Sequence, residues 1–578
     1  MSATPVRRSM ARRLTDLLPQ RSDWDALRHA PRRDLLAGIT VAVVALPLAL
    51  AFGVASGMGA QAGLITAVVA GALAAIFGGS NLQVSGPTGA MTVVLLPVVH
   101  QFGRTGVLMV GLLAGLLLVG MAFARLGRYV RYLPVPVVEG FTAGIAVVIA
   151  LQQVPAALGI ADAHGDKVWS AAANAVIRFA GHPRPVPIAV AAGVATLMLL
   201  GARWRPVVPF SLVGILVAMV LAETMGLPLA RIGALPSGFA QPSLAFLDWR
   251  ALPELLPAAG AVAALAALES LLSATVADAM SVDERHQPDR ELFGQGIANL
   301  VTPVLGGVPG TAAIARTAVS VRAGARSKLA AFTHAVSLAG VVLLAAPLVS
   351  RIPMAALAGV LLATAVRMIQ AASLLALIRA TRRDAIVLVL TFAVTVFFDL
   401  VTAVAVGIGV AVVLALRAIA RSARLERVPI DHDDRHAEEQ ALLDQHIVAY
   451  RLDGPLFFAA AHDFLLELSE VADVRVVILR MSRVSTIDAT GAHILDDAIT
   501  RLRRRGIAVL LSGIDPSHQQ VLSALGVAAR LRRDHLVFPD TPAAIDRARQ
   551  LLHLDPASSI AQAATAVTTD QRCATGGS

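Results

Sequence analysis

The chain has a single cysteine, Cys573, close to its end, so it can form neither an intrachain disulfide nor a cysteine-based metal site. Aromatic residues make up only 4% of the 578 residues, which leaves few rings on which nucleic-acid bases could stack. Charged residues make up 15%, whereas an average soluble domain has about 25%. These shortages argue against a disulfide scaffold, a nucleic-acid-binding surface and a chain that is soluble throughout.

Two catalytic signatures are also missing. The sequence has no GxxxxGK[ST] phosphate-binding loop and no HExxH zinc motif. Their absence argues against an ATP-driven pump and against a metalloprotease. We therefore expect a protein that is not an enzyme and that needs no cofactor or metal.

Apolar residues, in contrast, make up 56% of the chain. A membrane-spanning helix needs about 20 mostly apolar residues, and such runs recur from about residue 35 to residue 417. The clearest runs, of which the last is long enough for two spans, are 35–55, 104–124, 184–202, 205–222, 329–349 and 384–416. Other runs are short or interrupted by Gly and Pro, as expected of helices that stop halfway across a membrane: 60–77, 83–99 and 292–305.

Arginine dominates the net charge of +10, because lysine occurs only at Lys167 and Lys328. Arginines gather at both ends of the apolar region, in residues 1–33 and again from Arg417 to Arg427. Positive residues mark the cytoplasmic side of a membrane, so both ends are expected in the cytoplasm, with an even number of crossings, about twelve to fourteen. Residues 1–33 have no short apolar run before a cleavage site and are not expected to be a signal peptide.

Two stretches interrupt the apolar pattern in the same way. The first runs from Gly78 to Ala90 and the second from Gly306 to Arg316. Each has a Gly-Gly pair, a short extended piece, a proline placed to start a helix, and a run of small residues. A helix that begins in mid-membrane exposes unpaired N–H groups and about half a positive charge, which attract an anion. The motif occurs once in each half of the membrane region, which favours a transporter binding site between inverted repeats over two packing motifs.

An arginine and a glutamate within the apolar zone are candidates for the same site. Arg316 lies under two turns into the second predicted half-helix, where a cation adds to the field of the helix terminus; the alternative is an arginine that reaches the membrane interface. Glu269 lies in the apolar run 261–277 with no cation nearby in the sequence, so its charged form is expensive and it could carry a proton. Ser273 follows four residues later on the same face, and the pair could hold a proton or a small cation.

Other ionisable residues are predicted to be structural. Asp278 faces roughly the opposite side of its helix from Glu269. Glu139 and Asp399 lie at the ends of predicted spans and are interpreted as helix-end carboxylates. His334 opens an apolar run, which favours a hydrogen-bonded histidine at a helix end over a proton relay.

The composition changes after about residue 430, where charged residues return. Predicted strands are Ile447–Leu452, Val474–Arg480 and Ile507–Ser512, and predicted helices are 459–471, 489–504, 516–525 and 541–553. This alternation indicates an α/β sandwich of about 110 residues. The Ala/Ser/Thr-rich end from about residue 556 is predicted to be disordered.

One loop of this tail, Ser485–Gly491, follows a predicted strand and opens a helix. Asp488 is placed to cap that helix. Thr490 is an exposed hydroxyl near the helix N-terminus, where an added phosphate would be tolerated. Capping is the commoner reason for such a loop, so it is favoured over phosphorylation.

The chain resembles the SulP anion permease family, which includes the animal sulfate and chloride–bicarbonate exchangers, over about residues 31–553. The most specific matches are Leu268–Ala274, Arg285-His286, Glu291-Leu292, Gln295-Gly296, Ala298-Asn299, Gly306-Gly307, Pro309 and Ala313–Thr317. Further matches are Asp34-Leu35, Ala45–Pro47, Gly78–Ser80 and Gly86–Ala90. The tail is similar to a STAS domain, with Asp488–Gly491 at its Asp-Ser-Ser/Thr-Gly loop and Thr490 at the phosphorylatable position.

This resemblance implies a polytopic α-helical membrane fold with two inverted seven-segment repeats, about fourteen segments in core and gate subdomains, and a C-terminal α/β STAS domain. It implies a homodimer and an anion site between the third and tenth segments. Together with Arg316, the residues that would line this site are Phe52, Ser85, Gly86, Pro87, Thr88, Gly89, Ala90, Gly310, Thr311, Ala312, Ala313 and Ile314. Glu269 matches the coupling carboxylate of proton-linked bacterial members.

We therefore expect a multi-pass protein of the bacterial cytoplasmic membrane, with its termini in the cytoplasm. The expected parts are an N-terminal segment (1–33), a transport domain (34–418), a linker (419–440), a STAS domain (441–555) and a tail (556–578).

Three functions stay open from the sequence. The first is a proton-coupled secondary transporter of sulfate, bicarbonate or a C4-dicarboxylate, in which the core subdomain moves as a rigid body past the gate. The second is a bicarbonate importer in which Glu269, Ser273 and carbonyls near Gly310 hold Na⁺. The third is a passive anion channel, or a sensor whose STAS domain binds a cytoplasmic protein. Uracil and xanthine permeases share the fold class but usually have carboxylates where this chain has Arg316.

Overall fold

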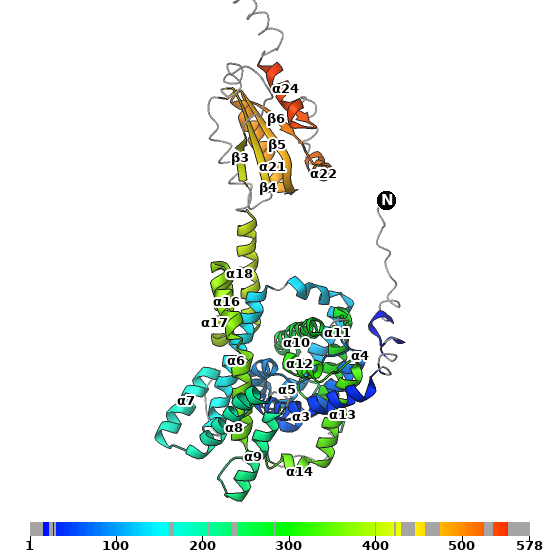
Figure 1. Ribbon diagram of the computed structural model, residues 1–578, viewed down its shortest axis with the longest axis vertical. Coiled ribbons are helices and arrows are strands. Elements are labelled where there is room, and N and C mark those ends of the chain that lie inside the picture. The colour runs from blue at the N-terminus through cyan, green and yellow to red at the C-terminus, as the bar shows by residue number, and fades with distance from the viewer. Residues whose placement is uncertain are drawn as a thin grey trace, which may run out of the picture. The chain divides into compact units, whose positions relative to one another are not determined.

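The structure is a computed structural model in which the chain divides into two units, residues 1–411 and 412–578 (Figure 1). It describes residues 15–21, 23, 27, 30–132, 134–160, 167–205, 208–233, 238, 241–281, 284–398, 400–420, 424–428, 446–456, 474–524 and 536–552. Asp399, the predicted helix 459–471 and the predicted disordered end lie outside these residues.

The first unit is helical. Its longer helices are α3 (Pro31–Ala55), α4 (Ala60–Phe77), α5 (Gly89–Phe123), α6 (Val135–Ala157), α7 (Val168–Gly181), α8 (Pro185–Trp204), α9 (Phe210–Thr224), α10 (Leu252–Met280), α11 (Pro288–Val301), α12 (Ile314–Arg322), α13 (Lys328–Leu344), α15 (Met354–Met368), α16 (Ala371–Ala380) and α17 (Arg382–Phe397). The division between the units falls within α18 (Leu400–Ala420). Among the described residues, seven helices are long and apolar enough to cross a membrane.

The helices of this unit pack as two groups (Figure 1). The core group consists of α3, α4, α5 and α10 to α13, in which α5 packs on α10 and α11 while α13 packs on α3 and α4. The gate group consists of α6, α8, α9 and α15 to α17, in which α6 packs on α15 and α17. Small residues allow close packing in the core group, since a Cβ on Gly63 of α4 would lie 2.0 Å from the carbonyl oxygen of Ala49 in α3.

Helix α5 combines residues 89–99 of the predicted run 83–99 with almost all of the predicted run 104–124, whereas residues 85–86 of the first run form strand β1. Its 35 residues are more than one bilayer crossing requires. Gly103 adopts a φ of 68° inside it, a left-handed conformation that glycine tolerates, and this residue divides α5 into two helices joined end to end. The run 384–416 is likewise confirmed as two helices, α17 and α18.

Two short strands join the halves of the core group. Strand β1 (Ser85–Gly86) follows α4, and β2 (Thr311–Ala312) follows α11 and a short 3₁₀ turn. They pair antiparallel, with Ser85 opposite Ala312 and Gly86 opposite Thr311. The order α3–α4–β1–α5 thus recurs as α10–α11–β2–α12 in the opposite direction, as expected of inverted repeats.

The second unit contains a five-stranded sheet in the order β3 (Arg424–Val428), β4 (Ile447–Leu456), β5 (Val476–Ile487), β6 (Ala508–Ser512) and β7 (Val537–Phe538). Only β3 is antiparallel to its neighbour. Its helices within the described residues are α21 (Ala489–Arg504), α22 (Pro516–Ala524) and α24 (Thr541–Leu551). The predicted alternation of strands and helices is confirmed from residue 474 onward, and the helix predicted at 459–471 stays untested. The sheet begins inside the predicted linker, because β3 precedes residue 441.

Candidate functional site

The N-termini of α5 and α12 meet at the β1–β2 pair. The amide of Ala313 donates to the carbonyl of Val84 at 3.1 Å, which extends the pairing by one residue. Helix α5 begins at Gly89 and α12 at Ile314, and neither has a side-chain cap on its first N–H groups. Because the strands are antiparallel, the two helices leave the pair in opposite directions. The two positive helix ends therefore face one region inside the protein.

Two details differ from the sequence prediction. Pro87 and Pro309 do not start the helices; both lie in the extended pieces that precede them. Pro87 follows β1 and Pro309 precedes β2, so each proline stiffens the extended backbone next to the strand pair. As a result, Arg316 is only the third residue of α12, in the first turn and not the second.

Arg316 is buried, with 1% of its surface exposed. It does not reach a membrane interface, so the alternative of an arginine extended to the surface is wrong. One terminal nitrogen donates to the carbonyl of Pro87 in the opposite repeat. Its Nε and Nη1 atoms have no hydrogen-bond partner within the described residues. A buried guanidinium with unused donors at two helix N-termini is suited to bind an anion.

Glu269 is isolated in the sequence but not in the fold. Its carboxylate accepts a hydrogen bond of 2.8 Å from the hydroxyl of Thr88, the residue that precedes α5. It also lies close enough to Arg316 for the two charges to interact. The structure therefore brings together an acid from α10, a hydroxyl from the start of α5 and a cation from α12.

Ser273 has a different neighbour from Glu269. Its hydroxyl bonds to the hydroxyl of Thr317 in α12 at 2.9 Å, and the Thr317 oxygen also accepts the amide of Val84 at 3.2 Å. Thr311 in β2 donates to the carbonyl of Ala266 at 3.0 Å. These contacts fasten α10 to the strand pair and make Ser273 a support for the site.

Sequence reasoning assigned no role to two buried amides of α11. Asn299 bonds the backbone of Gly310 twice, because its Oδ1 accepts the Gly310 amide and its Nδ2 donates to the Gly310 carbonyl, both at 2.9 Å. Gln295 donates to the hydroxyl of Ser85 at 2.7 Å. The sequence signal was present, since two amides four residues apart lie on one face of an apolar helix.

The first residues of α5 lie against the gate group. A Cβ on Gly89 would lie 2.2 Å from the Ile149 side chain of α6 and 3.1 Å from the ring of Phe52 in α3. Phe52 is buried, with 6% of its surface exposed. The predicted aromatic of α3 and the start of the half-helix are thus neighbours, and glycine is needed for their approach.

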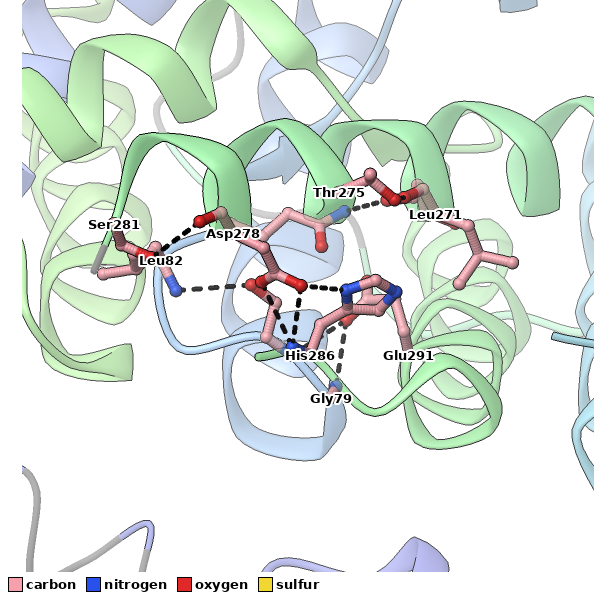
Figure 2. Close-up of polar contacts among 11 residues, drawn as sticks. Gly79, Leu82, Leu271, Thr275, Asp278, Ser281, His286 and Glu291 are labelled. Carbon is pink, nitrogen blue, oxygen red and sulfur yellow. Dashed lines mark hydrogen bonds and ion pairs between the residues drawn. The ribbon is translucent and has the colours of Figure 1, made fainter. Parts of the chain in front are cut away.

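A second polar cluster holds residues 78–80, the segment that leads from α4 into β1 (Figure 2). Glu291 of α11 accepts the amides of Gly79 at 2.9 Å and Ser80 at 3.3 Å. Asp278 at the end of α10 accepts the ring Nδ1 of His286 at 2.7 Å. The contact of Asp278 with His286 fastens the end of α10 to the segment that leads into α11, which agrees with the prediction that Asp278 is structural.

The prediction that His334 is a hydrogen-bonded histidine at a helix end is wrong. Helix α13 begins earlier, where Ser327 caps it by accepting the amide of Leu329, so His334 lies in the second turn. The side chain is fully buried, and neither ring nitrogen has a hydrogen-bond partner in the described part of the chain.

In the second unit, the capping role of Asp488 is confirmed, since its carboxylate accepts the amide of Gly491 at 2.7 Å. Thr490 is exposed in the first turn of α21.

Replacing Asp488 by Ala is expected to lower the stability of the second unit by about 1 kcal/mol, because an orphan N–H of α21 loses its acceptor. Hydrogen exchange of the Gly491 amide should become about fivefold faster. Asp497→Ala, two turns further along α21, is the control that should leave this amide unchanged.

A model of the sulfate permease family matches residues 32–391. The chain belongs to this sulfate permease family. A STAS-domain model matches residues 440–544 of this family member, in the second unit. The full chain is 33% identical over 511 residues to "Putative sulfate transporter YvdB" of Bacillus subtilis, and the match covers 87% of this chain and 95% of that protein. It is 31% identical over 528 residues to the bicarbonate transporter BicA of Picosynechococcus, covering 87% and 92%.

Two solved structures match this sulfate permease family member in fold. The transmembrane domain of a cyanobacterial BicA has a TM-score of 0.60 at 32% identity and covers 66% of this chain and 98% of that one. Murine SLC26A9, an anion transporter in the inward-facing state, has a TM-score of 0.79 at 17% identity and covers 95% and 96%. The predicted membrane fold with a C-terminal STAS domain is confirmed.

Proposed function

We propose that the protein is a secondary active transporter of a small anion that binds between β1–β2 and the first turns of α5 and α12. The observation that carries this proposal is Arg316, a buried cation with two unused nitrogens beside two uncapped helix N-termini. The site would consist of Phe52, Ser85–Ala90, Gly310–Ile314 and Arg316. Backbone N–H groups and the guanidinium would replace the water that the anion loses.

We propose that Glu269 couples transport to protons. Protonation of Glu269 would remove a negative charge that competes with the anion for Arg316, so anion and proton would bind favourably together. Once both are bound, the core group would move as a rigid body past the gate group and open the site to the other side of the membrane. Ser273 would act by holding α10 to α12 through Thr317.

The test is uptake of labelled sulfate, bicarbonate and fumarate into liposomes that contain the purified protein, with and without an inward proton gradient. We expect one anion to accumulate only when the gradient is present. Failure of all three to accumulate with the gradient would contradict proton-coupled transport of these anions.

Replacing Glu269 by Gln is expected to abolish gradient-driven accumulation while leaving exchange of the anion between the two sides. The amide mimics the protonated carboxyl, so the anion can still bind, but the proton gradient no longer does work through this group. Glu254→Gln, which neutralises an exposed carboxyl at the start of the same helix, should accumulate the anion as the wild type does. Accumulation by Glu269→Gln at the wild-type level would rule out this coupling role.

Bicarbonate is a specific alternative substrate to sulfate, because two relatives that are each 31% identical to the chain are named bicarbonate transporters. In that case Na⁺ would take the place of the proton near Glu269. The same liposomes with an inward sodium gradient separate the two forms of coupling. A passive channel would instead show conductance without accumulation under either gradient.

Three further proposals concern the setting of the protein. We place it in the bacterial cytoplasmic membrane with both termini in the cytoplasm, from the arginines at the ends of the apolar region. We expect a homodimer. The exposed Thr490 beside the Asp488 cap would be a phosphorylation or docking point for a cytoplasmic partner of the STAS domain.

A further inference from the structure

Two residues that precede α3, Leu17 and Asp23, contact the core group. Leu17 is buried within the large hydrophobic core of the first unit, with 6% of its surface exposed. A few residues later, the carboxylate of Asp23 forms an ion pair with Arg290 of α11 and lies 3.6 Å from Nζ of Lys328 in α13. The N-terminal segment is therefore attached to the core group by one apolar and one charged contact.

The two cations that Asp23 meets are themselves buried. The side chain of Arg290 is 3% exposed and that of Lys328 is 8% exposed. Both belong to the first turn of their helices, Arg290 as the third residue of α11 and Lys328 as the first of α13. The positive ends of two helices therefore add to the two positive side chains.

The neighbouring acceptors are mostly engaged elsewhere. Glu291 faces the same region, but one of its oxygens accepts the amides of Gly79 (Figure 2) and Ser80. Its other oxygen accepts a hydrogen bond from Gln295. Lys328 donates to the carbonyl of Gly78 at 2.6 Å, a neutral acceptor. Arg290 keeps an Nε without a partner among the described residues. Within the part of the chain that the structure describes, Asp23 thus supplies the carboxylate that forms ion pairs with these cations.

The charge of Asp23 is stabilised in this position. Burial by itself raises the pKa of Asp23. The hydrogen bonds from Arg290 and from the Gln20 amide, together with the charges of Lys328 and Arg290, outweigh it, so the pKa lies below its ordinary value. Asp23 is therefore an anion held in place by the chain.

We propose that Arg290 and Lys328 form a second anion site, distinct from the site proposed at the β1–β2 pair. Asp23 occupies this second site as a tethered ligand, and a free oxyanion can displace Asp23 from it. The ligand class follows from the donors, since a guanidinium fork beside an ammonium group fits phosphate-like or sulfate-like oxygens. Binding of a free oxyanion would release Asp23 from the core group. The attachment of Asp23 to the core group would then depend on the concentration of the oxyanion.

The first experiment follows the segment in the full-length wild-type protein in phosphatidylcholine nanodiscs. Arg21 is exposed two residues before Asp23, so trypsin cleavage after Arg21 measures release of the segment. Inorganic phosphate is expected to accelerate this cleavage severalfold, while chloride at equal ionic strength does not. Cleavage that phosphate leaves unchanged would overturn the displacement.

The second experiment removes the tethered ligand. Asp23→Asn is expected to lower the Tm by several degrees, because two buried cations lose their partner, and to bind phosphate at least roughly tenfold more tightly than the wild type, since no tethered carboxylate competes. Phosphate should restore the Tm of Asp23→Asn but not that of Asp23→Asn/Arg290→Gln. Asp248→Asn, at an exposed carboxyl of the same unit, is the control that should respond like the wild type.

A third arm separates the sources of the oxyanion. Rescue of Asp23→Asn by inorganic phosphate in phosphatidylcholine assigns the site to free anions. Rescue by phosphatidylglycerol nanodiscs without added phosphate assigns it to a lipid headgroup. An equal phosphate response in Asp23→Asn/Arg290→Gln, or no response to either source, would overturn the site.

Discussion

Replacing Arg316 by Gln is expected to lower anion uptake by roughly 100-fold or more, the size expected when a buried charge that pairs with a ligand is lost. The guanidinium is the cation that the first turn of α12 places next to the β1–β2 pair. It also donates a hydrogen bond to the Pro87 carbonyl of the other repeat. Uptake into liposomes under a proton gradient measures the effect. Arg316→Lys should retain part of the activity, because its charge remains but the planar fork does not.

Two controls separate binding from folding in this experiment. Arg322→Gln removes an exposed arginine two turns further along α12 and should leave uptake unchanged. Arg316→Gln/Glu269→Gln removes both of these interacting charges, so it should recover thermal stability relative to Arg316→Gln without recovering transport. Uptake within a few-fold of the wild type in Arg316→Gln would show that the anion does not depend on this cation.

Asn299→Ala is expected to cost about 3 kcal/mol in stability and to abolish uptake. The reason is that the side chain satisfies both backbone groups of Gly310, and each buried group left unpaired costs about 1–3 kcal/mol. Gly310 directly precedes β2, so its displacement would move the partner of Ser85 and Gly86. A lowered Tm in detergent, together with liposome uptake, measures both effects.

Asn299→Asp provides a graded comparison. A carboxylate oxygen can still accept the Gly310 amide but cannot donate to its carbonyl, so this variant should lie between the wild type and Asn299→Ala in stability. If Asn299→Ala and the wild type had the same Tm, Gly310 would be held by the strand pairing alone, and the assigned role of Asn299 would be wrong.

Local patterns in the sequence were sufficient for much of the fold. The repeated Gly-Gly and proline motif predicted two interrupted helices because glycine and proline act on their own backbone. Helix α21 matches its predicted bounds, since an apolar face recurs at helical spacing directly after the Asp488 cap.

Contacts between distant residues were not predictable in this way. Thr88 and Glu269 are 181 positions apart, and Asp23 and Arg290 are 267 positions apart, so no spacing rule relates them. The neighbours of Glu269 depend on how α10 is rotated against α5 and α12, which is determined by packing in three dimensions. Strand β3 was missed because its residues, Arg424–Val428, include three charged side chains and show little apolar alternation.

The pairing of β1 with β2 has a consequence for how the protein can diversify. The two repeats are joined there by backbone pairing, which does not itself require particular side chains on β1 and β2. Substitutions near the β1–β2 pair that leave this pairing intact can therefore change the size and charge of the side chains around the N-termini of α5 and α12. If the proposed anion site is correct, one backbone frame would in this way accommodate anions of different shape, and the side chains around it would determine which anion binds.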